Sequence, residues 1–167
     1  MSYRPEKIIS GGQTGSDIGA IVAAKDMEIL TGGWAPLGFK TEKGPQPVLA
    51  SYGLLETEDS GYNLRTELNV CDSDATLIFA RNPRSKGTLL TMQCAMRNGK
   101  PFSPPINPTD PDAYAQVSEF LLKHRPAVLN VAGNRESVAP GIARQVVDLL
   151  TYTLEQLNSP VVTHAAG

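Results

Sequence analysis

Short apolar runs alternate along the chain with segments in which apolar residues recur every three or four positions. The first pattern is typical of buried strands and the second of helices. Buried strands are predicted over 7–10, 29–31, 75–80 and 127–132. Helices are predicted over 14–28, about 60–71, 88–97, 113–121 and 142–157. The alternation predicts an α/β fold, with a mostly parallel sheet of five to six strands and helices on both faces.

Two strands should be central, and two segments interrupt the pattern. The runs 7–10 and 75–80 are apolar without alternation, so both are expected inside the sheet. In residues 34–59 the apolar positions show no regular periodicity. This segment is expected to form a long loop over the site, with a mobile insertion as the alternative. Prolines within 101–106 limit that segment to an edge strand or a very short one. One domain should span 1–160, followed by a loose tail.

Composition narrows the possible functions. The 167 residues carry a formal net charge of −2, which does not fit a general nucleic-acid binder. No apolar run approaches the length of a membrane span, and the first residues lack the apolar stretch of a signal peptide. Two cysteines and two histidines offer neither a disulfide framework nor a metal centre. We therefore expect a cytoplasmic protein with no nucleic-acid partner, no membrane partner and no metal held by side chains alone.

A glycine-rich turn follows the first predicted strand, with the sequence Ser-Gly-Gly-Gln-Thr-Gly-Ser-Asp over residues 10–17. Against the pattern G-x-G-x-x-G, Ser10 replaces the first glycine, while Gly12 and Gly15 fit. Glycine lets the backbone approach a ligand, and the helix start that follows offers free N–H groups to an anion. The turn is therefore a candidate phosphate cradle, in which an added side chain at Gly12 should exclude the ligand and leave the core intact. A tight turn without a ligand is the alternative. The candidate binding residues of this turn are Gly11, Gly12, Gln13, Thr14, Gly15 and Asp17.

Further candidates lie where other strands end. Because ligands of open α/β sheets bind beyond the carboxyl ends of the strands, these residues are expected around one anionic ligand. Gly32, Gly33 and Trp34 replace the acidic residue that an NAD site would need and are expected to form a loop over a flat group. The remaining candidates are Lys86, Gly87 and Thr88 at a helix start, and Asn130, Gly133 and Arg135 after the last strand.

The middle helix carries polar residues at helical spacing. Arg65, Asn69 and Asp72 follow one another at i, i+4 and i+7, opposite an expected apolar face of Leu64, Leu68 and Cys71. They are interpreted as a pocket wall with Arg65 as an anion clamp, or else as a solvated face. No residues pair in a pattern typical of a nucleophile, a general acid or a general base, so no catalytic residue is assigned.

Several blocks of the sequence together resemble the putative molybdenum carrier family, of the circularly permuted YpsA type within the SLOG and LOG superfamily. They lie at 8–17, 32–36, 57–70, 72–74, 76–79, 87–91, 129–137 and 140–142. The resemblance implies a Rossmann-like fold shared with cytokinin-activating phosphoribohydrolases. It also implies a homo-oligomer, dimer or tetramer, that binds molybdenum cofactor (molybdopterin), an anionic pterin phosphate carrying an oxo-metal group.

The sequence departs from the family at three places. Ile18 stands where a basic residue is usual, Lys86 replaces the first glycine of a Gly-Gly-Thr block, and prolines interrupt the strand near 101–106. In the related phosphoribohydrolases a glutamate occupies the position of Thr91, and threonine cannot act as that carboxylate. The resemblance thus favours a carrier of a phosphorylated pterin. A nucleotide-processing enzyme or a nucleotide sensor is the alternative, because nucleotides also combine a phosphate with a flat heterocycle.

Overall fold

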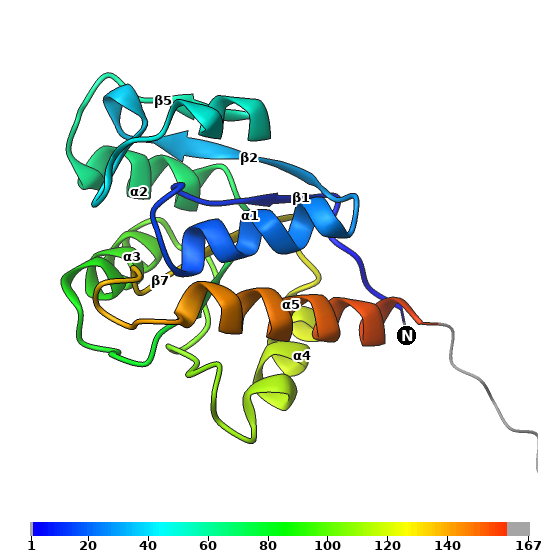
Figure 1. Ribbon diagram of the computed structural model, residues 1–167. Helices are drawn as coiled ribbons and strands as arrows, with labels where there is room; N and C mark the ends of the chain where they lie inside the picture. The colour runs from blue at the N-terminus through cyan, green and yellow to red at the C-terminus, as the bar shows by residue number, and fades with distance from the viewer. Residues whose placement is uncertain (1, 160–167) are drawn as a thin grey trace, which may run out of the picture.

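The protein forms a five-stranded parallel sheet with helices on both faces, as the computed structural model of residues 2–159 shows (Figure 1). The strands are β1 (Lys7–Ile9), β2 (Leu30–Ala35), β5 (Leu54–Glu56), β6 (Ala75–Phe79) and β7 (Val128–Gly133). The helices are α1 (Ser16–Asp26), α2 (Tyr62–Cys71), α3 (Lys86–Arg97), α4 (Ala113–His124) and α5 (Ile142–Asn158). The predicted α/β class is confirmed. The expected tail at 161–167 lies outside the described residues.

The strand order β5-β2-β1-β7-β6 places β1 in the centre, as predicted. In the register, Ile8 of β1 pairs with Thr31 of β2 on one side and with Leu129 of β7 on the other. Helix α1 packs against α5 on one face, and α2 packs against α3 on the other (Figure 1). All five strands are parallel, so their carboxyl ends meet at one edge, where ligands of such sheets bind.

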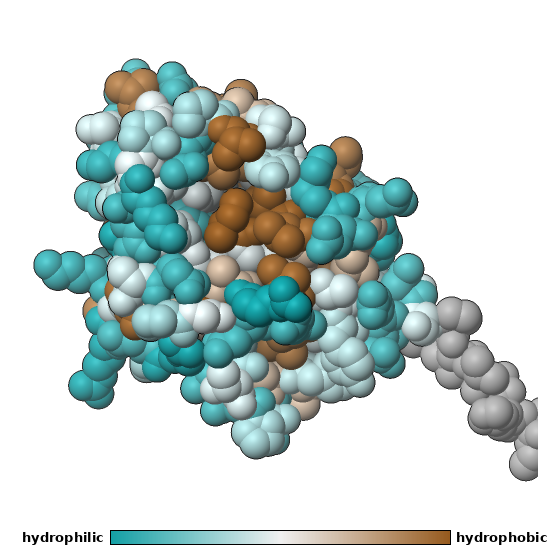
Figure 2. Space-filling view, viewed as in Figure 1, coloured by the Kyte–Doolittle hydropathy of each residue, from teal (hydrophilic) through white to brown (hydrophobic). Residues whose placement is uncertain are grey.

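The main core lies between the sheet and helices α1, α4 and α5. The predicted stripe of α5 is confirmed, since Ile142, Val146 and Leu150 are fully buried. Each such side chain contributes about 1.5–3 kcal/mol to stability through its burial. Apolar residues also gather on the outer surface over α1 (Figure 2), where Val22 is 39% exposed. Helix α1 thus contributes to the core and leaves an apolar patch on the surface.

The prediction that 75–80 is a central strand is wrong, because β6 ends the sheet. On its outer side β6 pairs with the segment 101–106 through two isolated bridges, Thr76 with Phe102 and Phe79 with Ile106, and the N–H of Ile78 donates to the hydroxyl of Ser103. Prolines 104 and 105 have no N–H to donate, so this segment cannot extend into a regular strand. The segment nevertheless covers β6, whose five residues are all buried.

Residues 34–59 do not form the expected structureless loop. They contain two 3₁₀ helices, Leu37–Phe39 and Pro47–Tyr52, and a small hairpin of β3 (Lys40–Thr41) and β4 (Gly44–Pro45). The segment also supplies β5, which pairs with β2 at the edge of the main sheet. Strand β5 escaped prediction because its apolar run is only two residues long.

The residues Gly32, Gly33 and Trp34 lie inside β2 and not in a loop beyond it. A Cβ on Gly33, whose φ is +123°, would lie 2.1 Å from the carbonyl oxygen of Ser10. Strand β2 therefore passes the end of β1 so closely that only glycine fits. These glycines serve the packing of two strands, which the sequence alone could not distinguish from a turn.

Helix α2 faces the protein with a polar side. Its buried residues are Thr66, Asn69 and Val70, whereas Cys71, expected on an apolar face, is exposed. The N-cap residue of the helix is Gly61, which provides no side-chain cap. The polar face is buried because the helix lies over the edge where the strands end, and this placement makes α2 a wall of the site described next.

Candidate functional site

A basic cavity of about 530 Å³ lies at the carboxyl edge of β1, β7 and β6. Its walls come from the glycine-rich turn, α2, the start of α3 and the segments after β6 and β7. Four cationic side chains line it, Arg65, Arg84, Lys86 and Arg135, against the single lining carboxylate of Asp17. Because the chain as a whole carries a net charge of −2, this concentration of positive charge favours an anionic ligand.

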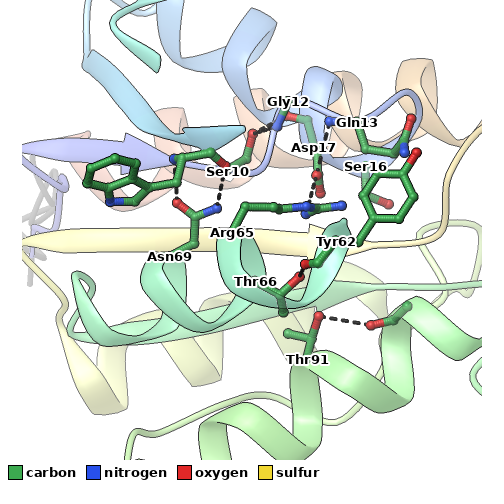
Figure 3. A network of polar contacts seen from close by, with 12 residues as sticks. Ser10, Gly12, Gln13, Ser16, Asp17, Tyr62, Arg65, Thr66, Asn69 and Thr91 are labelled. Atoms are coloured by element: carbon green, nitrogen blue, oxygen red, sulfur yellow. Dashed lines mark hydrogen bonds and ion pairs between the residues drawn. The ribbon is translucent and has the colours of Figure 1, made fainter. Parts of the chain in front are cut away.

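Arg65 and Asp17 form a buried ion pair in the cavity wall (Figure 3). The Arg65 Nη1 atom lies 3.3 Å from Asp17 Oδ2, and the two side chains are 12% and 5% exposed. Burial raises the pKa of Asp17 above its ordinary value, although Arg65 and the N–H of Gln13 partly offset that effect. Arg65 satisfies only part of its hydrogen-bonding capacity here, since its Nε atom is buried without a partner. Arg65, the expected anion clamp, therefore lines the cavity and retains one donor without a hydrogen-bond partner.

Tyr62 connects the arginines of α2 and of the turn after β7. The guanidinium carbons of Arg65 and Arg135 lie 5.2 Å and 5.1 Å from the centre of the Tyr62 ring. Cation–π attraction of this kind holds both guanidinium groups beside the cavity. Sequence analysis missed Tyr62, although its position three residues before Arg65 places both side chains on one helical face.

The start of α3 carries three of the predicted candidates, Lys86, Gly87 and Thr88. Ser85 caps the helix by accepting a hydrogen bond from the N–H of Thr88, and Lys86 and Gly87 line the cavity. A Cβ on Gly87 would meet nothing within 4 Å, so the space next to it is open. The first N–H groups of a helix lack partners within the helix and favour anions. Thr88 itself is buried, and its hydroxyl contacts Ser85 and not the cavity.

In the glycine-rich turn, expected to be a phosphate cradle, three N–H groups donate to the protein's own side chains. The N–H of Gly12 donates to Ser10 Oγ over 3.3 Å, and that of Gln13 donates to Asp17 Oδ2 over 3.2 Å. The N–H of Thr14 donates to the side-chain oxygen of Gln13 over 3.0 Å. From this turn only Gln13 and Asp17 line the cavity. A negative charge belongs at this helix start, as expected, and Asp17 already provides it.

Replacement of Gly12 with alanine should therefore lower stability and leave the affinity of the folded protein for anions nearly unchanged. The added Cβ would lie 2.7 Å from a Leu49 methyl carbon and 2.9 Å from one of Leu54, pointing away from the cavity, and φ is +71°. We expect a loss of about 1–3 kcal/mol in the free energy of unfolding, measured by urea denaturation. Loss of anion binding in folded Gly12→Ala protein, measured by calorimetry, would instead restore the original interpretation.

Gly11 and Gly15 also serve packing. A Cβ on Gly11 would lie 2.0 Å from Arg65 Nη1, so this glycine makes room for the arginine. A Cβ on Gly15 would lie 2.4 Å from the carbonyl oxygen of Asn134, so this glycine lets the turn contact the segment after β7. The two glycines bring α2 and the final turn up to the site.

The glycines 32 and 33 of β2 lie outside the cavity lining, and so do four other predicted residues, Trp34, Asn69, Asp72 and Asn130. Asn69 accepts from the N–H of Trp34 over 2.8 Å and donates to its carbonyl oxygen over 2.9 Å, which ties α2 to β2. The indole N–H of Trp34 donates to Asp72. Asn130 donates to Thr76 within the sheet. The position of Trp34 in β2 gives no support to the idea that it covers a ligand, and these side chains connect secondary-structure elements.

The cavity contains no carboxylate at the position of the phosphoribohydrolase glutamate. Thr91 lines the cavity there, and its hydroxyl donates to the carbonyl oxygen of Gly87 over 3.0 Å. Within residues 2–159, no cluster of histidine, cysteine and carboxylate side chains could hold a metal ion. The same part of the chain contains no helix long and apolar enough to cross a membrane. The arrangement offers donors and positive charge to an anion.

Comparison with known proteins agrees with this architecture. A model of the circularly permutated YpsA SLOG family matches residues 8–154. The chain belongs to this family. It is also similar to the crystal structure of a protein from Syntrophus aciditrophicus titled "Putative molybdenum carrier protein", with a TM-score of 0.85 and 38% sequence identity. That similarity covers 92% of this chain and 98% of the other. A comparison with curated proteins finds no match.

Proposed function

We propose that this SLOG-family protein binds and carries molybdenum cofactor, a phosphorylated pterin, in the basic cavity. One observation carries the proposal: the cavity combines four cationic side chains with two buried donors, Gln13 Nε2 and Arg65 Nε, that have no partner. A buried donor without a partner costs about 1–3 kcal/mol, which a ligand acceptor would recover. The crystal structure titled as a molybdenum carrier supports this choice among anionic ligands.

The cavity residues fit the two chemical parts of such a ligand. The start of α3, with Lys86, Gly87 and the nearby Arg84, would hold the phosphate by charge and backbone N–H groups. The guanidinium groups beside Tyr62 would contact the flat pterin, since guanidinium planes stack on conjugated rings. The described side chains provide no metal-binding cluster, so the protein would hold this cofactor by its phosphate and ring. Its role is then to retain a ligand, without a chemical step.

The proposal includes two further features of the carrier. We place it in the cytoplasm, where its cofactor would be delivered to another protein. We also propose a homo-oligomer, a dimer or tetramer, which the apolar patch over α1 supports because large exposed apolar patches mark interaction surfaces (Figure 2).

The test is to identify what the protein binds. Native mass spectrometry of freshly purified protein should show an added mass that denaturation releases as a phosphorylated pterin. Calorimetry should then show saturable binding of that pterin, weakened by salt because charge contributes to affinity. Release of a nucleotide, or hydrolysis of a nucleoside monophosphate by the purified protein, would contradict the carrier proposal and favour the nucleotide-processing alternative.

A further inference from the structure

The side chain of Gln13 lies in the cavity wall, and its amide is held in a fixed orientation. The side chain is only 5% exposed and lines the cavity. Its oxygen accepts two backbone hydrogen bonds, from the N–H of Thr14 over 3.0 Å and from the N–H of Glu42 over 2.9 Å. Its Nε2 atom is buried and has no partner. Rotating the amide by 180° would direct its NH₂ at two N–H donors, so the observed orientation is the one the protein can satisfy.

Glu42 holds this arrangement in place from the tip of the β3–β4 hairpin. Its carboxylate accepts from the hydroxyl of Thr14, and from both the hydroxyl and the N–H of Ser137, the latter over 3.1 Å. The hairpin is thereby attached to the turns after β1 and β7. Because Glu42 is anchored on both sides, its N–H stays against the Gln13 oxygen, and the NH₂ of this cavity-lining side chain stays on the opposite side of the amide, without a partner.

We propose that Gln13 is a specificity-determining residue that donates a hydrogen bond from Nε2 to an acceptor on the ligand. The inference rests on the proposed function of the cavity and adds a selection rule to it. Among the residues that line the cavity, Arg65 Nε is the other buried donor without a partner, so the cavity suits a ligand with a carbonyl, a ring nitrogen or a phosphate oxygen as acceptor. A ligand that placed a donor group next to Gln13 would leave its own donor and the Gln13 NH₂ without an acceptor. The cavity would therefore reject such a ligand.

The test compares two isosteric substitutions that each add one negative charge to the cavity. Gln13→Glu keeps an oxygen for the N–H groups of Thr14 and Glu42 and removes only the NH₂. Asn82→Asp is the matched control, because Asn82 also lines the cavity and the variant keeps the oxygen that accepts from the N–H of Arg84. With 6-hydroxymethylpterin phosphate as the probe, calorimetry should show a loss of affinity at least tenfold larger for Gln13→Glu than for Asn82→Asp.

Two further probes locate the acceptor. If inorganic phosphate shows the same difference between the variants, Gln13 contacts the phosphate, and if unphosphorylated 6-hydroxymethylpterin shows it, Gln13 contacts the ring. In the wild type, the side-chain NH₂ resonances of Gln13 in the NMR spectrum should shift when a probe that binds is added. Equal losses in both variants with every probe, or unshifted Gln13 resonances at saturation, would overturn the inference.

Failure of the proposed function gives a different result. If the wild type binds a nucleoside monophosphate and no pterin, the carrier proposal fails, and the same comparison of variants with that nucleotide still decides the role of Gln13. If the wild type binds none of these acceptor-bearing probes, both proposals are wrong.

Discussion

Arg65→Gln is expected to lower the free energy of unfolding by about 3 kcal/mol and to abolish measurable binding of a phosphorylated ligand. The first effect follows because Asp17, whose side chain is 5% exposed, would lose its ion-pair partner while remaining buried. The second follows because the variant loses a positive charge of the cavity lining and the buried Nε donor that has no partner. Urea denaturation and calorimetry measure the two effects separately.

The stability loss should depend on pH in a direction set by Asp17. Its pKa in the folded protein is raised by burial, so between the unfolded and folded pKa values the folded state binds more protons. The contribution of Asp17 to the free energy of unfolding therefore increases as the pH falls through the pKa of Asp17 in the folded protein. Arg65 lowers the pKa of Asp17, so its removal should raise that pKa further. The pH range in which the folded state binds more protons should then be wider. The difference in stability between wild type and Arg65→Gln should shrink as the pH is lowered through the raised pKa of Asp17.

A double variant separates stability from binding. Asp17→Asn combined with Arg65→Gln removes both charges, so it should recover most of the lost stability, since neither charge is left buried alone. Binding should stay absent, because the cationic donor is still missing. Recovery of ligand binding in the double variant would show that Arg65 acts only by neutralising Asp17, and a pH-independent loss in the single variant would contradict the proposed electrostatic cause.

The fold could be predicted from sequence where the pattern is local and strong. The apolar run at 7–10 and the stripe of α5 identified a central strand and a packed helix correctly. The position of β6 at the edge of the sheet could not be predicted, because it depends on whether the segment 101–106 pairs with β6 as a regular strand. Prolines 104 and 105 prevent that pairing. Strand β5 is too short to leave a periodic signal and forms only by pairing with β2.

The candidate site shows the same limit. The spacing of Arg65 from Asn69 and Asp72 identified a helix that contributes Arg65 to the cavity lining, and the motif at 86–88 identified a helix start that lines the cavity. The glycine-rich turn suggested free N–H groups, but whether such groups are free depends on side chains that fold back, and Asp17 and Gln13 do so here. Sequence patterns report which residues can bind an anion, whereas long-range contacts decide which of them remain available.

The largest loss of stability among the glycine substitutions is expected for Gly133→Ala, at the end of β7. An added Cβ would lie 1.8 Å from the carbonyl oxygen of Phe79, and φ is +149°, where a side chain is strained. The Phe79 oxygen also accepts from Ser16 Oγ over 3.1 Å and from the N–H of Asn134 over 3.0 Å. Displacing it would disturb the end of β6, the start of α1 and the last turn together. We expect a loss of at least about 3 kcal/mol, measured by urea denaturation.

Gly87→Ala is the matched control, because it adds the same methyl group to another glycine of the cavity lining. Nothing lies within 4 Å of that Cβ, and alanine is favoured over glycine in a helix, so stability should change by less than about 1 kcal/mol. If Gly133→Ala were as stable as Gly87→Ala, the ends of β6 and β7 would not be as closely packed as described. A large difference would show that Gly133 is required because two strand ends and a helix start meet there, and that the cavity depends on this junction for its shape.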